Sequence, residues 1–179
     1  MSVLKPSVSK LDHFQGNSED PITLVEYGDY QCTSCGRAYL IVKKIQKQMG
    51  ENLKFVFRNF PLENIHPKAI PAAIAAEAAA KQDKFWEMHD IIFENQVNLH
   101  ENSFKNFAEQ LGLEMAQFNK DIENEDVLQK IESDFEGGVK SGVNGTPAFF
   151  INGIHYNGSW EYTNLLEVLQ LELKKEKVV

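Results

Sequence analysis

The chain contains two cysteines, Cys32 and Cys35, which are separated by two residues. They follow an apolar run that predicts a strand over 22–27, and they precede a stretch with helical periodicity over 36–49. Cysteines at this spacing at the start of a helix lie on one face of its first turn, close enough to form a disulfide, and the free N–H groups there can stabilise a thiolate. The spacing therefore predicts a dithiol that alternates between a reduced and a disulfide-bonded form.

The two sulfurs are expected to play different parts. Cys32 lies near the helix N-cap, where backbone N–H groups and the helix dipole favour the thiolate, so it is the predicted nucleophile. Cys35 lies inside the first turn and is less exposed. It is the predicted resolving thiol, which attacks the mixed disulfide formed by Cys32 and releases the substrate.

An acidic residue, Glu26, interrupts the apolar run before the cysteines. If the strand buries it, desolvation raises its pKa, which suits a group that accepts the proton of Cys35, through water. The sequence leaves a second interpretation open, in which Glu26 lies on an edge strand and faces solvent.

Thr146 and Pro147 open a later strand after a flexible stretch. A cis bond before Pro147 would leave the backbone groups of Thr146 exposed beside Cys32, where they could hold an extended substrate peptide by strand addition. The local sequence alone does not decide between a cis and a trans bond.

The elements around these residues predict an α/β fold. The strand over 22–27, the helix over 36–49 and an alternating aromatic strand over 53–60 form a βαβ unit, with the cysteines at its first strand-to-helix turn. Asn152 and Gly153 predict a tight hairpin, and a leucine-rich helix follows it. We therefore expect βαβ plus ββα around a central mixed sheet, interrupted by an all-helical insertion.

The same patterns divide the chain. The polar start predicts an N-terminal arm over 1–20, and the helical pattern breaks at Gly137 and Gly138. The expected core comprises 21–62 and 138–179, and the inserted helical subdomain comprises 63–137.

Composition excludes several functional classes. The chain has 179 residues, 42% of them hydrophobic, which suits one globular domain with an insertion. Its formal net charge of −8 opposes binding to nucleic acid or to an anionic membrane. No apolar run is long enough for membrane insertion, and the first twenty residues lack a secretory signal. The sequence as written predicts a cytoplasmic location, or a periplasmic one if its N-terminus is a processed end.

No metal or other cofactor is expected. The five histidines lack the spacing of known metal-binding motifs, and two cysteines are too few for a typical zinc site. These histidines are His13, His66, His89, His100 and His155.

Four segments together carry a family resemblance: 25–35, 57–62, 84–89 and 142–153. They resemble the DsbA-like branch of the thioredoxin superfamily, in which a thioredoxin core carries an inserted helical domain. The resemblance implies thiol–disulfide exchange with protein thiols or disulfides, and a redox-recycling partner. It also implies that Cys32 attacks, that Cys35 resolves, that Glu26 is the buried acid, and that Pro147 is a cis-proline facing the disulfide.

The chain departs from the strongly oxidising members of that family between the cysteines. It has Thr33 and Ser34 where those members carry proline and histidine. A histidine there helps to stabilise the thiolate, so we expect a higher pKa of Cys32 and a less oxidising disulfide than in those members. Whether the chain oxidises, reduces or isomerises its substrates stays open.

An enzyme is the leading hypothesis, and two others remain. A chaperone-like module would bind unfolded peptides in the same groove, independently of redox state. A redox sensor would use the disulfide to switch a partner surface.

Overall fold

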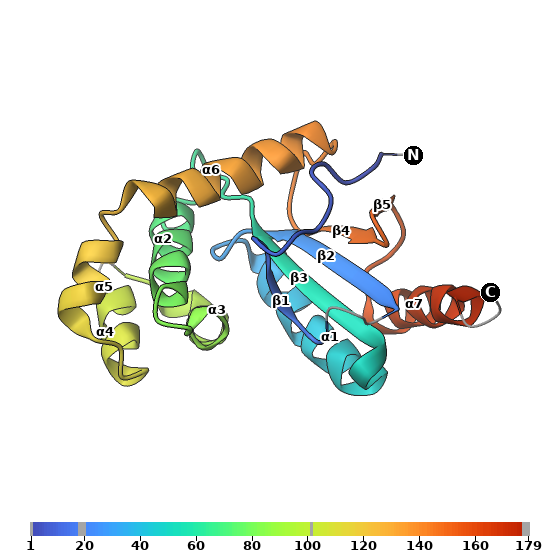
Figure 1. The fold of residues 1–179 in the computed structure, drawn as a ribbon, viewed down its shortest axis with the longest axis horizontal. Helices are drawn as coiled ribbons and strands as arrows, with labels where there is room; N and C mark the ends of the chain where they lie inside the picture. Colours follow the sequence, from blue (N-terminus) through green and yellow to red (C-terminus); the bar gives the residue numbers. More distant parts are fainter. Residues whose placement is uncertain (1, 18–20, 101, 177–179) are drawn as a thin grey trace.

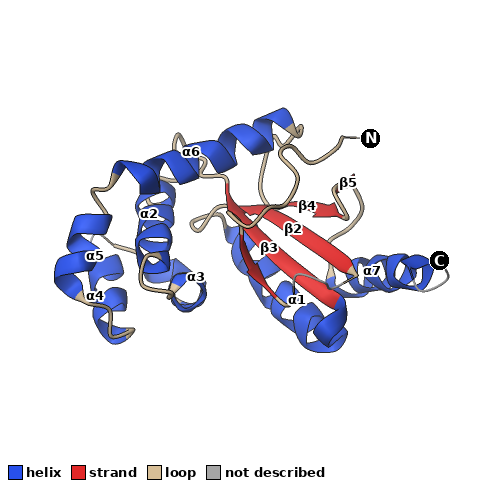
Figure 2. Cartoon of the chain, viewed as in Figure 1, coloured by secondary structure: helices blue, strands red, loops and turns tan. Residues whose placement is uncertain are grey.

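The computed structural model describes residues 2–17, 21–100 and 102–176. In these residues a five-stranded sheet has the order β1-β3-β2-β4-β5 (Figures 1 and 2). The strands are β1 (His13–Gln15), β2 (Ile22–Gly28), β3 (Leu53–Asn59), β4 (Ala148–Ile151) and β5 (Ile154–Tyr156). The helices are α1 (Thr33–Met49), α2 (Ala69–Ala80), α3 (Phe85–Glu94), α4 (Ser103–Gln110), α5 (Met115–Asp121), α6 (Glu125–Lys140) and α7 (Tyr162–Glu176), with 3-10 turns η1 (Gly50–Asn52) and η2 (Gln96–Asn98).

Strand β2 is the centre of the sheet. It pairs in parallel with β3, where Glu26 lies opposite Phe57, and antiparallel with β4, where Glu26 lies opposite Phe149. A strand covered on both faces needs apolar side chains on both, which explains the nearly continuous apolar run. The expected mixed sheet built from βαβ and ββα units is confirmed.

The hairpin between β4 and β5 follows from its two turn residues. Asn152 and Gly153 both have positive φ angles, of 47° and 80°. A two-residue turn with this geometry matches the twist of the flanking strands, and asparagine and glycine tolerate it best. The hairpin is therefore confirmed as the sequence predicts it.

The sheet separates two hydrophobic cores. Leu24 on β2 and Phe55 on β3 contribute to the larger core, which includes the buried faces of α1 and α7 and extends into the helical insertion. Val25 and Tyr27 face a smaller core on the other side, which is closed in part by Leu4 from the N-terminal segment. Figures 1 and 2 show helices α2 to α6 grouped beside one end of the sheet.

Strand β1 is not apparent in the sequence. Residues 13–15 lie within the predicted N-terminal arm, yet they pair antiparallel with β3, with Phe14 opposite Val56. Three residues are too few for a strand to show its alternation in the sequence. The part of the arm that includes His13–Gln15 thus forms an edge of the sheet.

Helix α6 continues through Gly137 and Gly138, although the sequence predicts that the helical pattern breaks there. A Cβ atom at Gly138 would lie 2.6 Å from the Phe60 ring, and one at Gly137 would lie 2.9 Å from the carbonyl oxygen of Lys5. The glycines therefore permit close packing of a helix that does not end there. The division of the chain at residues 62 and 138 stays a prediction, and α6 runs across the second of these positions.

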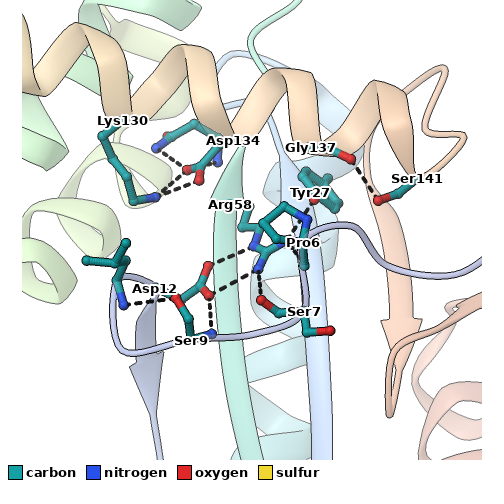
Figure 3. Close-up of polar contacts among 12 residues, drawn as sticks. Pro6, Ser7, Ser9, Asp12, Tyr27, Arg58, Lys130, Asp134, Gly137 and Ser141 are labelled. Carbon is teal, nitrogen blue, oxygen red and sulfur yellow. Dashed lines mark hydrogen bonds and ion pairs between the residues drawn. The ribbon is translucent and has the colours of Figure 1, made fainter.

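A buried arginine fastens the N-terminal segment to the sheet (Figure 3). Arg58, on β3, donates hydrogen bonds to both carboxylate oxygens of Asp12, at 2.7 and 3.0 Å. Its remaining N–H groups donate to the carbonyl oxygens of Pro6 and Ser7 and to the Tyr27 hydroxyl. All five N–H donors of Arg58 have acceptors, so the guanidinium can remain buried. Most of these acceptors belong to the N-terminal segment, which is thereby ordered against the sheet.

We expect Asp12→Ala to lower the free energy of unfolding by about 3–5 kcal/mol, since it leaves a buried guanidinium without its counter-ion. Denaturant titration of both proteins measures the change. Glu172→Ala is the matched control, because it removes an exposed ion pair with Lys175 and should cost less than about 1 kcal/mol. Equal, small effects of the two substitutions would contradict this account of Arg58.

Candidate active site

The two cysteines lie at the start of α1. Cys32 is the N-cap residue and is partly exposed, whereas Cys35 lies in the first turn and is fully buried. Both carry free thiols. The helix begins at Thr33, so the structure places both sulfurs in the positions that the sequence predicts.

The surroundings give the two thiols opposite acidities. A hydrogen bond from the Cys35 thiol, helped by the backbone N–H groups of Cys35 and Ser34, lowers the pKa of Cys32 to about 5, although partial burial opposes this. Burial, the same hydrogen bond and the nearby Glu26 raise the pKa of Cys35 well above its usual range. At neutral pH the site therefore holds a thiolate at Cys32 and a thiol at Cys35.

Glu26 is buried in the middle of the sheet, with 2% of its surface exposed. This rules out the interpretation of a solvent-facing edge residue. Burial raises the pKa of the Glu26 carboxyl to about 8, and the negative charge of Cys32 adds to the effect.

One carboxyl oxygen of Glu26 has no hydrogen-bond partner among the described residues. A cavity of about 10 Å³ is lined by Glu26 together with Gln15, Gln46 and His89. That volume holds about one water molecule, and these polar side chains would supply its hydrogen bonds. The surroundings of Glu26 therefore suit proton transfer through water.

The loop before β4 lies against the exposed sulfur. The bond between Thr146 and Pro147 is cis, as the resemblance implies, and the Cys32 thiol lies 3.5 Å from the carbonyl oxygen of Thr146. The structure thus brings together Thr146, Pro147 and Cys32, which are far apart in the sequence.

A buried aspartate that the sequence analysis does not single out orders the loop between β2 and α1. One carboxylate oxygen of Asp29 accepts hydrogen bonds from the N–H groups of Gln31 and Cys32, at 2.7 and 3.1 Å. The other accepts from the N–H group of Leu62 and lies 2.8 Å from Nδ1 of His66. An aspartate shortly before a helix start commonly forms a turn, so the bonds to Gln31 and Cys32 have a local sequence signal. The contacts with Leu62 and His66, which follow β3, have no such signal in the sequence.

Other polar groups near the cysteines also have partners. The Tyr30 hydroxyl lies 3.1 Å from Nδ1 of the buried His89. Gln96, a second residue that the sequence analysis missed, donates to the backbone carbonyl groups of Tyr30 and Cys32. In the described parts of the chain, no three or more histidine, cysteine or acidic side chains are grouped so that they could hold a metal ion. None of the described helices is long and apolar enough to cross a membrane.

Two substitutions of Asp29 should lower the free energy of unfolding by different amounts. Asp29→Asn keeps an oxygen for the N–H groups of Gln31 and Cys32 but loses the acceptor for Leu62 and His66. Asp29→Ala loses both and should lower the free energy of unfolding by about 2–4 kcal/mol, because buried donors are left unpaired. Denaturant titration tests the order wild type, Asn, Ala. An Ala variant as stable as the wild type would contradict the assigned hydrogen bonds.

Comparison with known proteins agrees with this geometry. A protein-family model described as Thioredoxin matches residues 9–170. The chain is 37% identical over 172 residues to the Na(+)/H(+) antiporter NhaA 1 of Mycolicibacterium vanbaalenii, and 40% identical over 149 residues to the antiporter of the same name from Salinispora arenicola. These matches cover 95% and 83% of this chain but only 28% and 23% of the antiporter proteins.

Solved structures resemble the chain over nearly its whole length. Oxidised BdbD from Bacillus subtilis has a TM-score of 0.83 at 26% identity and covers 97% of this chain and 98% of its own. A thioredoxin-like oxidoreductase from Silicibacter pomeroyi has a TM-score of 0.78 at 26% identity, covering 96% of this chain and 95% of its own. The alpha-DsbA1 protein of Wolbachia pipientis shares the fold, with a TM-score of 0.83 at 21% identity, and covers 96% of this chain and 95% of its own. The chain therefore belongs to the thioredoxin family and has the DsbA-like form of its fold.

Proposed function

We propose that the chain is a thiol–disulfide oxidoreductase that exchanges disulfides with protein or peptide substrates through Cys32 and Cys35. The observation that carries this proposal is the opposite acidity of two thiols in one helical turn. One sulfur is ionised and partly exposed, and the other is protonated and buried. The structural similarity to BdbD and to a thioredoxin-like oxidoreductase supports the same function.

In the first step the Cys32 thiolate attacks one sulfur of a substrate disulfide. A bond forms between Cys32 and that sulfur, the substrate S–S bond breaks, and the second substrate sulfur leaves as a thiolate that takes up a proton from solvent. The product is a mixed disulfide between Cys32 and the substrate.

In the second step Glu26 first releases its own proton to solvent through water; the carboxylate then takes up the proton of Cys35 through water, and Cys35 attacks the sulfur of Cys32. The bond to the substrate breaks, and the substrate sulfur leaves and is protonated. The protein ends with a Cys32–Cys35 disulfide, and two electrons have passed to the substrate. The negative charge of Cys32, which helps to keep Glu26 protonated, is absent from the mixed disulfide, so the carboxylate forms more easily at the step that needs it.

The same steps in reverse oxidise a substrate dithiol. A substrate thiolate attacks the sulfur of Cys32, and Cys35 leaves. Its high pKa requires a proton donor in the buried interior, and the Glu26 carboxyl supplies that proton. Glu26 is in this proposal a proton carrier for Cys35 in both directions.

Thr146 and Pro147 are proposed to bind the substrate. The carbonyl oxygen of Thr146 lies beside the Cys32 sulfur, where an extended peptide can add as a strand. Pro147 has no N–H group, so it does not compete for the acceptors of that peptide.

The direction of exchange, the recycling partner and the compartment are further parts of this proposal. With Thr33 and Ser34 between the cysteines, we expect a less oxidising disulfide than in members that carry proline and histidine. Equilibration against a series of glutathione redox buffers measures the potential, and cell fractionation distinguishes the cytoplasm from the periplasm.

Serine substitutions separate the proposed roles of the two sulfurs. Cys32→Ser should abolish the acceleration of insulin reduction by dithiothreitol, because no exposed thiolate remains on the protein. Cys35→Ser should keep rapid attack on a small aromatic disulfide but accumulate the mixed disulfide, which mass spectrometry detects. Turnover by the Cys32→Ser protein, with its fold intact by circular dichroism, would overturn the proposed function.

The Glu26 carboxyl should also show in the pH dependence of stability. In a Cys32→Ser background, the Glu26 carboxyl should make the free energy of unfolding fall by about 1.4 kcal/mol per pH unit as the pH rises from about 4.5 towards its folded pKa, which burial still raises although the charge of Cys32 is gone. The folded state holds this proton more tightly than the unfolded chain, so the contribution is complete below the unfolded pKa and is lost as the pH rises through the folded one.

The control for this measurement is Cys32→Ser combined with Glu26→Gln, because an amide does not titrate in this range. Denaturant titrations at a series of pH values give the free energy of unfolding of both proteins. Only the protein that keeps Glu26 should show the fall in this free energy as the pH rises from about 4.5. Parallel profiles for the two proteins would show that Glu26 does not hold its proton in the folded state.

A further inference from the structure

One side chain of the helical insertion hydrogen-bonds directly to the backbone carbonyl groups of the active-site loop. Gln96, in the 3-10 turn η2 after α3, donates from Nε2 to the carbonyl oxygen of Tyr30 at 2.9 Å and to that of Cys32 at 2.8 Å. The two carbonyl groups belong to the residues on either side of Gln31. A single amide group is therefore hydrogen-bonded to both ends of this short segment before α1. Gln96 lies 64 positions after Cys32 along the chain.

The first turn of α1 leaves space for this amide. A Cβ atom at Gly36 would collide with the side-chain oxygen of Gln96. The N–H group of Gly36 also donates to the Cys32 carbonyl oxygen, at 3.1 Å, so this oxygen accepts one hydrogen bond from the helix and one from the insertion. The absence of a side chain at Gly36 therefore lets the Gln96 amide reach the Cys32 carbonyl oxygen, to which the N–H group of Gly36 also donates.

We propose that Gln96 is a positioning residue for the attacking sulfur: it fixes the backbone of Cys32 so that the first-turn N–H groups of α1 face the thiolate. This inference rests on the proposed role of Cys32. The physical reason is geometric, because the N–H groups of Ser34 and Cys35 stabilise the sulfur only while the Cys32 backbone holds it over the helix end. The hydrogen bond from Gln96 to the Cys32 carbonyl oxygen also reduces the negative potential of that group near the sulfur.

Two substitutions separate hydrogen bonding from packing. Gln96→Ala removes the donors and the bulk, so the pKa of Cys32 should rise from about 5 towards the ordinary value of about 8.5. Its alkylation by iodoacetamide at pH 5 should slow about threefold, since the thiolate fraction falls. Gln96→Met keeps the approximate size of the side chain but has no donor, so it should slow alkylation as much as Ala does.

The readouts are the thiolate absorbance at 240 nm as a function of pH, the alkylation rate, and the reduction potential in glutathione buffers. Gln110→Ala, an exposed glutamine of α4 in the same insertion, is the matched control and should leave all three unchanged. A role of Gln96 in packing alone would leave the Met variant close to wild type, which would overturn the proposal.

Gly36→Ala gives an independent test, because alanine favours the helix but displaces the Gln96 side chain. It should slow alkylation as Gln96→Ala does, and it should add nothing in the Gln96→Ala background. Additive effects would overturn the proposal, as would unchanged titration curves in both Gln96 variants. Because thiolate titration and alkylation need no protein substrate, these results are distinct from a failure of the proposed function, which would appear as a wild-type protein without turnover.

Discussion

The site depends on the burial of one carboxylate. Asp29 lies at the end of β2 with almost no exposed surface, so its charge must be balanced by hydrogen bonds from within the protein. It obtains them from the N–H groups of Gln31 and Cys32 on one side and from the loop after β3 on the other. The two parallel strands at the centre of the sheet are thereby joined at their carboxyl ends, and Cys32 is held at the start of α1.

The chemistry follows from how differently two neighbouring sulfurs are placed. Cys32 and Cys35 are separated by one helical turn, yet the helix end and the hydrogen bond from Cys35 stabilise charge on the first, while burial prevents charge on the second. Glu26 is on the central strand, where its carboxyl is equally removed from water. The fold therefore excludes solvent from Cys35 and Glu26, the proposed proton partners, and leaves Cys32, the proposed nucleophile, partly accessible.

The features that the sequence predicts well are those with local causes. The apolar run of β2, the helical period after Cys35 and the turn at Asn152 each follow from neighbouring residues, so the mixed sheet and the position of the dithiol could be derived. Glu26 was the harder case, since the sequence could not show whether β2 is a central or an edge strand. Only the pairing of β2 with both β3 and β4 settles this.

The features that the sequence did not predict depend on contacts between distant segments. Strand β1 is too short to show a period, and it forms because β3 offers it an edge. Gln96 has no motif around it, and its proposed role rests on its hydrogen bonds to two carbonyl groups of a distant loop. The glycines of α6 resemble a helix stop, because sequence patterns do not reveal that an aromatic ring lies where a Cβ atom would be.

The path of α6 has a consequence for how the molecule moves. Its residue Asp134 accepts hydrogen bonds from the backbone and side chain of Asn59 at the end of β3, and Asn59 also donates to Glu77 on α2. A hinge between the helical insertion and the sheet would have to break these buried bonds and lift Gly138 away from Phe60. These buried contacts therefore oppose a hinge between the two parts, so in the proposed exchange a disulfide would reach Cys32 through movement of the substrate polypeptide and not of the insertion.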